Sequence, residues 1–328
     1  SVEVLRGYDR HQVHALLSER SGVFDSIFVS KAHVMEFFAP IIPTLSPRPR
    51  IIYDAEMVFS LRELAATTPQ ASQTLTTQEL EFVVDAEVSV ADAADVVLTV
   101  SEDEAGHFRR RGKAGVHVLG HSLNTEPTTA SYRERSGLLS VGSYRGQSVP
   151  KGDGVLWYLD EIQPLIRKAL GDQAAQITLA GLSKAERLRR PFNTLCKVAT
   201  SLDDLLPLYG HARICIVPAK SGIGMTRRVL EAAAHGVPVV TTPELAEQIG
   251  WTIGVELLVG STTKEFAEAC VQLYQSPVLW EQLRTNALNQ VSTTCSPQAF
   301  GSTLRAALGE GSRKPPAGRF GAMPRTHR

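Results

Sequence analysis

Short apolar segments of strand length alternate with segments of helical period along almost the whole chain. In the first half, the expected strands are Val2–Leu5, Phe24–Ser30, Arg50–Tyr53, Val96–Val100 and Val116–Leu119. The expected helices between them are Arg10–Glu19, Ala32–Ile42, Val58–Ala66, Thr76–Ala94 and Glu102–Arg111. Several strands are continuously apolar, which is typical of a parallel sheet that is covered on both faces. The alternation therefore predicts an α/β fold built from right-handed βαβ units.

The same alternation resumes after a polar stretch at residues 121–136. The expected strands of the second half are Leu138–Gly142, Ile177–Ala180, Lys197–Thr200, Arg213–Pro218, Val237–Thr241 and Glu256–Val259. Its expected helices are Val155–Leu170, Leu202–Tyr209, Thr226–His235, Lys264–Gln275, Pro277–Gln290 and Pro297–Leu308. Two similar halves of this kind predict two Rossmann-like, doubly wound parallel sheets.

A length of 328 residues is sufficient for two domains with separate cores. We predict a first domain at 1–122, a linker at 123–136 and a second domain at 137–295. A helix at 296–308 is expected to cross back to the first domain, and the Gly-, Pro- and Arg-rich segment 309–328 is expected to be disordered. The sequence opens inside an expected strand and without Met, so we also expect the first domain to be incomplete by one βαβ element of roughly 30 residues.

Composition excludes several classes of protein. The 34 basic and 34 acidic residues balance, so the broad positive field of a nucleic-acid-binding protein is missing. No uncharged apolar run of about 18 residues exists, which predicts a chain that does not span a membrane. The four cysteines include no Cys-x-x-Cys pair, which favours a reducing, cytoplasmic location over a disulfide framework or zinc site. The basic run at 109–113 and the basic tail are expected to be solvated, with weak docking to the inner face of a membrane as the alternative.

The segment 217–241 carries the clearest chemical signal. A strand ends at Pro218, a loop with Gly222 and Gly224 follows, and a helix then begins. Glycine lets backbone N–H groups approach an anion closely, and the helix start offers unpaired N–H groups and a positive dipole end. Arg227 or Arg228 can add a charge-assisted contact to a diphosphate, and Glu231 can accept from the vicinal hydroxyls of a ribose. The alternative is an ordinary helix cap with surface arginines and a solvated glutamate.

Residues 222–232 and 235–242 resemble the donor-site block of GT-B glycosyltransferases, in particular the retaining enzymes of glycosyltransferase family 4 (glycosyl transferases group 1). Further stretches resemble the same family, at 139–144, 153–159, 179–181 and 204–218, and more loosely at 52–56, 61–64 and 94–102. The resemblance covers nearly all of residues 1–308. It implies a GT-B fold and transfer of a sugar from a nucleoside-diphosphate sugar with retention of anomeric configuration.

By position in that family, the donor-binding candidates are Gly142, Ser143, Arg145, Lys151, Gly222, Ile223, Gly224, Met225, Arg228 and Glu231. Arg228 takes the position that neutralises the leaving phosphates, and Glu231 takes that of the ribose-binding acid. Many family members carry a second glutamate eight positions before the ribose-binding one, where this chain has Ile223. The resemblance then places the sugar contacts on the backbone amides of this loop. No Asp-x-Asp motif is present, so no metal and no cofactor is expected.

Three residues of the first domain are catalytic candidates because they follow expected strands. His33, Asp54 and Glu56 can orient the acceptor or act as a base. A histidine on a helix surface explains His33 equally well, and a helix N-cap explains Asp54 nearly as well.

We therefore expect a metal-independent, retaining glycosyltransferase with an unidentified polysaccharide, lipid or small-molecule acceptor, as in cell-envelope or polysaccharide biosynthesis. A non-catalytic relative that binds a nucleotide sugar is one alternative, and a nucleotide-sugar epimerase of the same architecture is another. A nicotinamide-dependent oxidoreductase is disfavoured because no Gly-x-Gly-x-x-Gly with a following acidic residue occurs after a strand.

Overall fold

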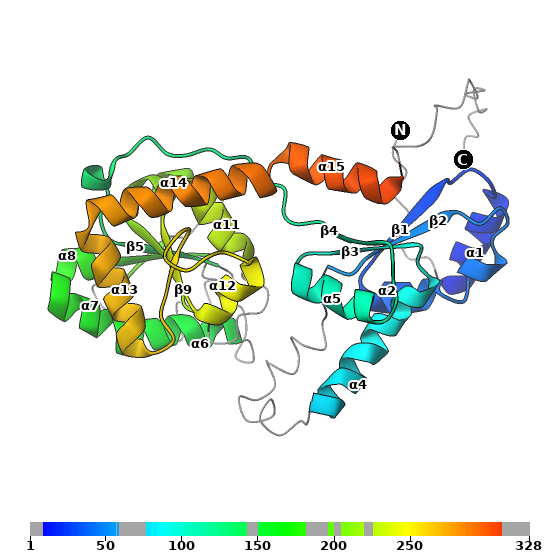
Figure 1. The fold of residues 1–328 in the computed structure, drawn as a ribbon, viewed down its shortest axis with the longest axis horizontal. Helices are drawn as coiled ribbons and strands as arrows, with labels where there is room; N and C mark the ends of the chain where they lie inside the picture. The colour runs from blue at the N-terminus through cyan, green and yellow to red at the C-terminus, as the bar shows by residue number, and fades with distance from the viewer. Residues whose placement is uncertain are drawn as a thin grey trace.

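The chain forms two parallel sheets, one in each half of the sequence (Figure 1). The computed structural model describes residues 9–56, 58, 77–142, 150–181, 196–199, 205–219 and 226–309. Both sheets are flanked by helices, so the mixed α/β fold with parallel sheets predicted from the alternation is confirmed.

The first sheet has four parallel strands in the order β1-β2-β3-β4. These strands are β1 (Ser26–Ser30), β2 (Arg50–Asp54), β3 (Val96–Thr99) and β4 (Val116–Val118). The helical segments of this half are α1 (Arg10–Glu19), α2 (Ala32–Phe38), η1 (Ile42–Thr44), α4 (Thr77–Val88), η2 (Ser89–Ala93) and α5 (Glu102–Arg110). Consecutive strands in the chain are also neighbours in the sheet, as expected of successive βαβ units.

The second sheet has six parallel strands in the order β10-β9-β8-β5-β6-β7. These strands are β5 (Leu138–Val141), β6 (Ile177–Ala180), β7 (Cys196–Ala199), β8 (Ile214–Val217), β9 (Val239–Thr241) and β10 (Leu258–Val259). Its helical segments are η3 (Tyr132–Glu134), α6 (Pro150–Trp157), η4 (Tyr158–Ile162), α7 (Gln163–Leu170), α8 (Asp172–Ala175), α10 (Leu206–His211), α11 (Thr226–Ala234), α12 (Pro243–Ile249), α13 (Thr263–Gln275) and α14 (Pro277–Thr294).

This strand order reverses direction between β5 and β8. The chain proceeds from β5 outward through β6 and β7 on one side, then returns to β8 and proceeds through β9 and β10 on the other. Connections from β5 and β8 consequently leave toward opposite faces of the sheet, which opens a crevice beyond their carboxyl ends. Open α/β sheets bind ligands at this position.

Side chains of the second sheet alternate between two hydrophobic cores. Leu138, Ile214 and Ile216 belong to the core on one face. Leu139 and Cys215 belong to the core on the other. Both sets are almost fully buried, because successive residues of a strand point to opposite faces and helices cover each face.

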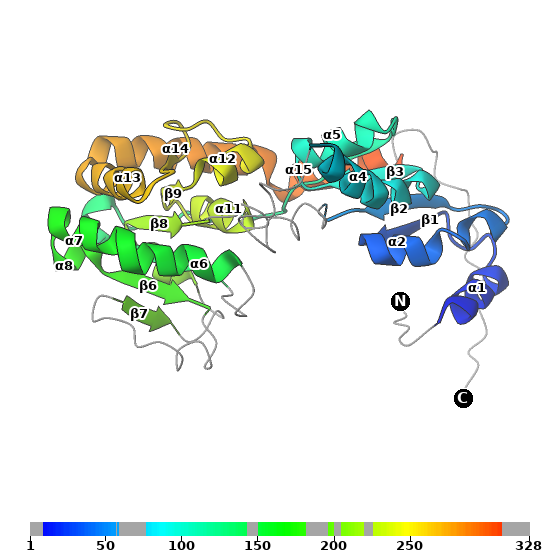
Figure 2. The ribbon, with the colours of Figure 1, turned by 90° about the horizontal axis from the view of Figure 1, so that it is seen from below.

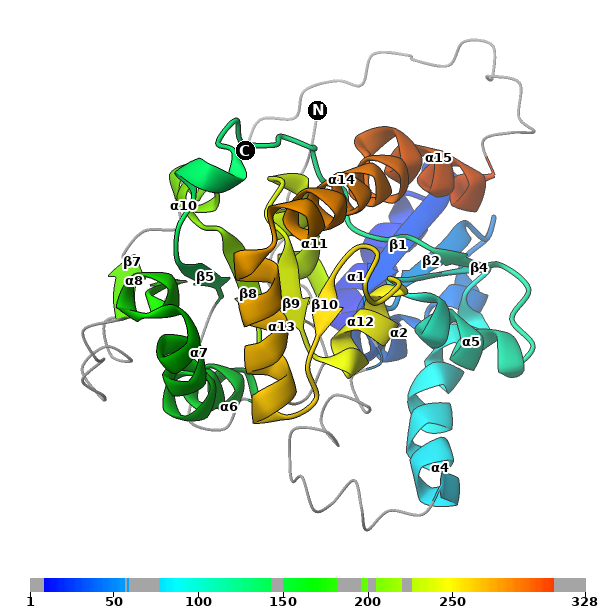
Figure 3. The same ribbon diagram turned by 60° about the vertical axis from the view of Figure 1, so that its left-hand side comes forward.

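The last described helix, α15 (Pro297–Leu308), returns to the first domain. Ala307 joins a small apolar cluster with Ile52, Val96 and Leu98 of β2 and β3. Arg50 Nη1 also donates to the carbonyl oxygen of Leu308 at 2.9 Å. Figures 1 and 3 show α15 lying over the first sheet after α14 has crossed the second domain. The chain therefore passes between the domains twice, once before and once after the second sheet.

Most expected elements occur with shifted ends. The expected helix Ala32–Ile42 stops at Phe38, and the expected helix Val155–Leu170 begins earlier, at Pro150, and contains a π-helical turn at Tyr158–Ile162. Two short helices, α8 and α12, were not predicted. The expected strand Val2–Leu5, nearly all of the expected helix Val58–Ala66, and residues 310–328 lie outside the described residues.

The linker between the domains is fastened to the second domain by Arg135. This side chain is fully buried, although the sequence indicated only a polar boundary there. Its guanidinium donates to the carbonyl oxygens of Tyr209 at 2.6 Å and Ala212 at 3.1 Å, and it lies over the ring of Trp280. Burial, followed by the nearby Arg284, lowers the pKa of Arg135 to about 10. The guanidinium therefore remains charged at neutral pH and binds the linker through carbonyl oxygens.

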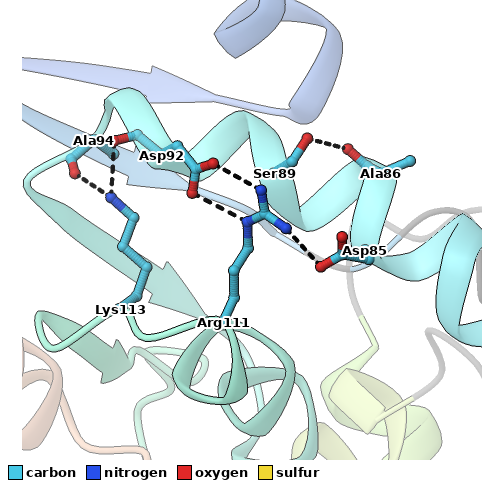
Figure 4. Close-up of polar contacts among 7 residues, drawn as sticks. All are labelled: Asp85, Ala86, Ser89, Asp92, Ala94, Arg111 and Lys113. Atoms are coloured by element: carbon cyan, nitrogen blue, oxygen red, sulfur yellow. Dashed lines mark hydrogen bonds and ion pairs between the residues drawn. The ribbon is translucent and has the colours of Figure 1, made fainter.

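The basic run at 109–113 is engaged inside the first domain. Arg111 pairs with Asp85 at 2.6 Å and Asp92 at 2.8 Å, and Lys113 Nζ donates to the carbonyl oxygens of Asp92 and Ala94 (Figure 4). These contacts join the end of α5 to α4 and η2. The expectation of a purely solvated helix end was therefore wrong for Arg111 and Lys113, because two carboxylates and two carbonyl oxygens of the neighbouring helical segment lie within their reach.

Candidate functional site

The carboxyl ends of the two sheets are turned toward each other. The arrowheads of β6 and β8 point toward the first domain, and the chain leaves β2 at Asp54 on the side that faces the second domain (Figure 2). This arrangement brings the polar residues after the first-sheet strands opposite the β5–β8 switch point. We therefore take these two facing edges as the candidate site.

Gly142 and Arg228 meet at the switch point, although 86 positions separate them in the sequence. Gly142 follows β5, and Arg228 lies in the first turn of α11. A side-chain methyl group at position 142 would overlap the guanidinium of Arg228, whose Nη2 atom would be 2.9 Å from it. The Gly142 N–H donates to the carbonyl oxygen of Ala180 at 2.8 Å, so this donor is used in a hydrogen bond to the neighbouring strand β6. Gly142 contributes to the site by lacking a side chain, which leaves room for the arginine.

Glu231 lies one turn further along α11 and is paired with Arg227. Arg227 Nε donates to Glu231 Oε1 at 2.7 Å in an i, i+4 ion pair, in which the Glu231 side chain is 25% exposed and that of Arg227 is 62% exposed. The sequence alone left open whether Arg227 or Arg228 is the phosphate-binding cation. The structure separates the two: Arg228 lies against Gly142, while Arg227 holds Glu231.

Buried threonines fix the end of β8, where the glycine-containing loop begins. Thr241 Oγ1 donates to the Val217 carbonyl oxygen at 2.8 Å, and Thr242 Oγ1 donates to that of Ala219 at 3.0 Å. Both threonines are at most 4% exposed. These two threonines were not predicted from the sequence, because no local signal distinguishes a buried threonine of this kind.

Gly154 brings α6 into backbone contact with the same strand end. A side-chain methyl group at this position would overlap the carbonyl oxygen of Pro218. The helix can lie this close to the end of β8 only because residue 154 has no side chain. This glycine was not a sequence candidate either, although a glycine inside a helix that otherwise packs through Val155 and Trp157 is a usable signal.

Several donor-site candidates cannot be placed. Ser143, Arg145, Gly222, Ile223, Gly224 and Met225 lie outside the described residues. Lys151 belongs to α6, but its side chain is not among those described. The described donor-site candidates are therefore Gly142, Arg228 and Glu231, and the structure brings all three to one end of the second sheet.

Asp54 and Glu56 lie together at the end of β2. The Glu56 N–H donates to Asp54 Oδ1 at 3.2 Å, and Ser30 Oγ at the end of β1 donates to Glu56 Oε1 at 2.8 Å. Asp54 thus organises the turn after its own strand. In the first domain, Lys31 and Glu56 are the described non-glycine residues with positive φ, at 77° and 53°. Such backbone conformations are uncommon outside glycine and concentrate at functional sites.

The environment of this strand end is acidic. Burial raises the pKa of Asp54, the hydrogen bond from the Glu56 N–H lowers it, and the Glu56 charge raises it, for a net increase. Burial also raises the pKa of Tyr53, and the carboxylates of Glu87, Asp54, Glu36 and Glu56 raise it further. A carboxyl group whose proton affinity is raised is better suited to accept a proton from a substrate hydroxyl. His33, by contrast, is an exposed residue of α2.

The described residues contain neither a membrane-spanning helix nor a cluster of metal ligands. None of the helices there is long and apolar enough to cross a membrane. No group of three or more His, Cys, Asp or Glu side chains in the same part of the chain has a geometry that can hold a metal ion.

Comparison with known proteins identifies the second half of the chain. Residues 135–276 match the family model described as "Glycosyl transferases group 1". This part of the chain is similar to the glycosyl transferases of group 1. The matched range contains β5 to β10, Gly142, Arg228 and Glu231, so the family resemblance noted in the sequence is confirmed. Glycosyl transfer is the activity class of this family.

Solved structures with the same fold cover both domains. Sucrose-phosphate synthase from Thermosynechococcus elongatus has a TM-score of 0.66 at 15% identity, and the match covers 92% of this chain and 78% of that one. HepE from Anabaena, solved with UDP and glucose, has a TM-score of 0.63 at 13% identity, with coverage of 92% and 80%. A trehalose-phosphate synthase from Burkholderia vietnamiensis has a TM-score of 0.64 at 13% identity, with coverage of 93% and 78%. No protein with a curated description matches the sequence. The chain thus has the GT-B fold of these structures.

Proposed function

We propose that this protein is a glycosyltransferase, which transfers a sugar from a nucleoside-diphosphate sugar to an acceptor hydroxyl with retention of anomeric configuration and without a metal ion. The observation that carries the proposal is the contact of Arg228 with Gly142 at the β5–β8 switch point. This contact puts a guanidinium at the first turn of α11, where the helix dipole already favours an anion. Two phosphates are the anion that such a site suits best.

In the proposed reaction, the bond between the sugar anomeric carbon and the diphosphate oxygen breaks as a bond to the acceptor oxygen forms. Negative charge grows on the leaving diphosphate, and Arg228 together with the amino end of α11 stabilises it. Glu231 binds the ribose hydroxyls of the donor. Asp54 and Glu56 orient the acceptor across the gap, and Asp54 takes the proton that the acceptor hydroxyl loses. Closure of the two domains over the donor brings these groups together.

Calorimetric titration with uridine, guanosine and adenosine diphosphate tests the binding part of this proposal. We expect the wild type to bind at least one of them, and Arg228→Ala to weaken that binding by tenfold or more, since a hydrogen bond to a charged group contributes about 1.5–3 kcal/mol. Arg167→Ala is the control, because that exposed arginine of α7 pairs with the exposed Asp172 and should leave the diphosphate affinity unchanged. Equal diphosphate affinity in the wild type and Arg228→Ala would contradict the proposal.

Incubation of the protein with the matching nucleotide sugar tests the chemistry. We expect an acceptor-dependent product whose anomeric configuration, read by NMR, equals that of the donor, and whose yield is unchanged by EDTA. A new sugar isomer formed from the donor alone would identify an epimerase. Binding without any turnover across a panel of acceptors would identify a non-catalytic nucleotide-sugar-binding protein.

A further inference from the structure

The carboxyl end of α11 is closed by the linker between the domains. A helix leaves its last carbonyl groups without partners inside the helix. At the end of α11, the Glu126 N–H donates to the Ala234 carbonyl oxygen at 3.0 Å. Thr128 donates to the His235 carbonyl oxygen twice, from its N–H at 3.1 Å and from Oγ1 at 3.2 Å. The linker therefore supplies hydrogen-bond donors to the end of the helix whose amino end carries Arg228.

Arg284 of α14 joins the same helix end to the linker. Its Nε donates to the carbonyl oxygen of Gly236 at 3.2 Å, and its Nη2 donates to that of Thr128 at 3.2 Å. The guanidinium lies over the ring of Trp280, with 5.7 Å between Cζ and the ring centroid, and the side chain is 20% exposed. The dipole of α11 is negative at this end, which favours a cation. One side chain thus bonds both to the turn that ends α11 and to the linker.

Both segments that connect the domains are attached to α11. α14 leads into α15, which packs on the first sheet, and α14 itself packs against α11 (Figures 1 and 3). Ala287 and Val291 of α14 share a hydrophobic core with Ala233 of α11. The linker and α14 also meet at the domain boundary, where the Leu123 N–H donates to the Cys295 carbonyl oxygen at 2.8 Å. A change in the angle between the domains therefore acts on segments that hold the carboxyl end of α11.

A displacement at this end of α11 also moves its other end. The helix has nine residues, Thr226–Ala234, and so spans roughly 13 Å. At its amino end, Arg228 lies so close to Gly142 that a methyl group there would overlap the guanidinium. A helix this short tilts as one body, and the contact between Arg228 and Gly142 leaves little room for a tilt. The position of the proposed diphosphate site therefore depends on how the carboxyl end of α11 is held.

We propose that Arg284 is a positioning residue for the donor site, which couples diphosphate binding at the amino end of α11 to the linker at its carboxyl end. The inference rests on the proposed function, because it takes the amino end of α11 with Arg228 as the diphosphate site. Arg284 acts through α11, by holding the carbonyl oxygens of Gly236 and Thr128, so that Arg228 keeps its place beside Gly142. Coupling between two sites is reciprocal, so a bound diphosphate also steadies the linker.

Titration calorimetry with the best-bound of uridine, guanosine and adenosine diphosphate tests the positioning role. We expect Arg284→Met to weaken binding about fivefold or more, the lower end of ordinary coupling between sites. Arg284→Lys keeps the charge and one donor for these carbonyl oxygens, so it should bind more weakly than wild type but more tightly than Arg284→Met.

Gln163→Met is the matched control for a loss of stability. Gln163 is buried in α7, on the opposite face of the second sheet from α11, and its Nε2 donates to the Ala175 carbonyl oxygen at 2.9 Å. Like Arg284→Met, this substitution removes a side-chain donor from a backbone carbonyl group. We expect it to lower Tm and to leave the diphosphate affinity unchanged.

The binding data can overturn the inference in two ways. Wild-type affinity in both Arg284 variants would show that Arg284 does not position the site. An equal loss of affinity in Gln163→Met and Arg284→Met would show that the loss follows stability and not the position of α11. A wild type that binds no nucleoside diphosphate would instead contradict the proposed function, and this inference with it.

Hydrogen exchange tests the coupling from the side of the linker. In the wild type, a saturating nucleoside diphosphate should slow exchange about fivefold or more in peptides that span residues 123–130. These peptides include the Glu126 and Thr128 amides that bond to the end of α11. In Arg284→Met, saturated with the same nucleotide, the slowing should be much smaller, because the linker has lost its bond to Arg284. A wild type that binds the nucleotide without any slowing in the linker would overturn the inference.

Discussion

Arg228 occupies the space directly beside Gly142, so that the guanidinium and a side chain at position 142 exclude each other. The end of β5 and the first turn of α11 are thereby fitted to one another across the switch point of the second sheet. The fit explains why glycine is needed at position 142 even though its φ lies outside the left-handed region. It also makes the phosphate binding proposed for Arg228 sensitive to a residue that itself offers no charge.

Gly142→Ala should therefore displace Arg228. We expect a tenfold or greater loss of nucleoside-diphosphate affinity with little change in Tm, because the guanidinium can swing away from the new methyl group at the cost of its charge-assisted contact. Titration calorimetry and thermal denaturation measure the two effects. Gly301→Ala in α15, where the nearest described atom is a flexible arginine nitrogen at 3.7 Å, is the control and should change neither. Wild-type affinity in Gly142→Ala would contradict the fit.

Gly154→Ala should instead destabilise the second domain. The new methyl group would collide with the backbone carbonyl of Pro218, which cannot rotate away as a side chain can. Overpacking of this kind costs about 1–3 kcal/mol. We expect a lower Tm and, since α6 would be pushed off the end of β8, weaker nucleotide binding as well. Gly106→Ala in α5 is the control: it meets only the Arg110 side chain and should be neutral or stabilising.

Arg135→Met should lower the free energy of unfolding by about 3 kcal/mol or more. The substitution leaves the carbonyl oxygens of Tyr209 and Ala212 buried without their donor, and each unsatisfied group costs about 1–3 kcal/mol. Arg167→Met provides the contrast, because that arginine is exposed and its ion pair within the described residues is with the exposed Asp172, an interaction worth about 0–1 kcal/mol. Urea titrations of the two variants measure the difference, and similar losses in both would contradict the anchoring role of Arg135.

Thiol labelling should be slow in the folded protein near pH 8. Burial raises the pKa of Cys196 to about 11 and that of Cys215 to about 12, and it also raises the pKa of Cys270 and Cys295. Only the thiolate reacts with iodoacetamide, so little reactive form exists at that pH. We expect all four cysteines to be labelled rapidly in guanidinium chloride. Labelling of Cys196, the most accessible of them, should accelerate up to about pH 11 in the folded state; a plateau near pH 9 would contradict its raised pKa.

Local sequence signals were sufficient to predict the ends of two helices that begin with a side-chain cap. The expected bounds of α1 and α15 agree with the structure. Asp9 and Gln12 form a capping box at the start of α1, and Ser296 followed by Pro297 begins α15. These interactions span three residues or fewer and are visible in sequence. The π-helical turn after Trp157 has no comparable local signature, so the start and character of that helix were missed.

The sequence was sufficient to nominate residues for the candidate site, but not to predict which of them are in contact. The order of strand, glycine-containing loop and helix nominated Arg227 or Arg228 together with Glu231, and the family resemblance favoured Arg228 and added Gly142. The assignment of Arg228 to the Gly142 edge and of Arg227 to Glu231 depends on how α11 packs against β5, which only the tertiary structure determines. Arg135 was missed for a related reason: its carbonyl partners lie 74 and 77 residues away, and a segment rich in polar residues gives no sign that one of them is buried.

The return of α15 makes the first domain discontinuous in sequence. Residues 297–308 pack on Ile52, Val96 and Leu98 of the first sheet, so a fragment cut at the linker would lose this cover. Such a fragment would be aggregation-prone by itself. The packing of the amino-terminal half is thus completed only when α15, the last helix of the described chain, has been synthesised, and a cut at the linker does not separate the two domains cleanly.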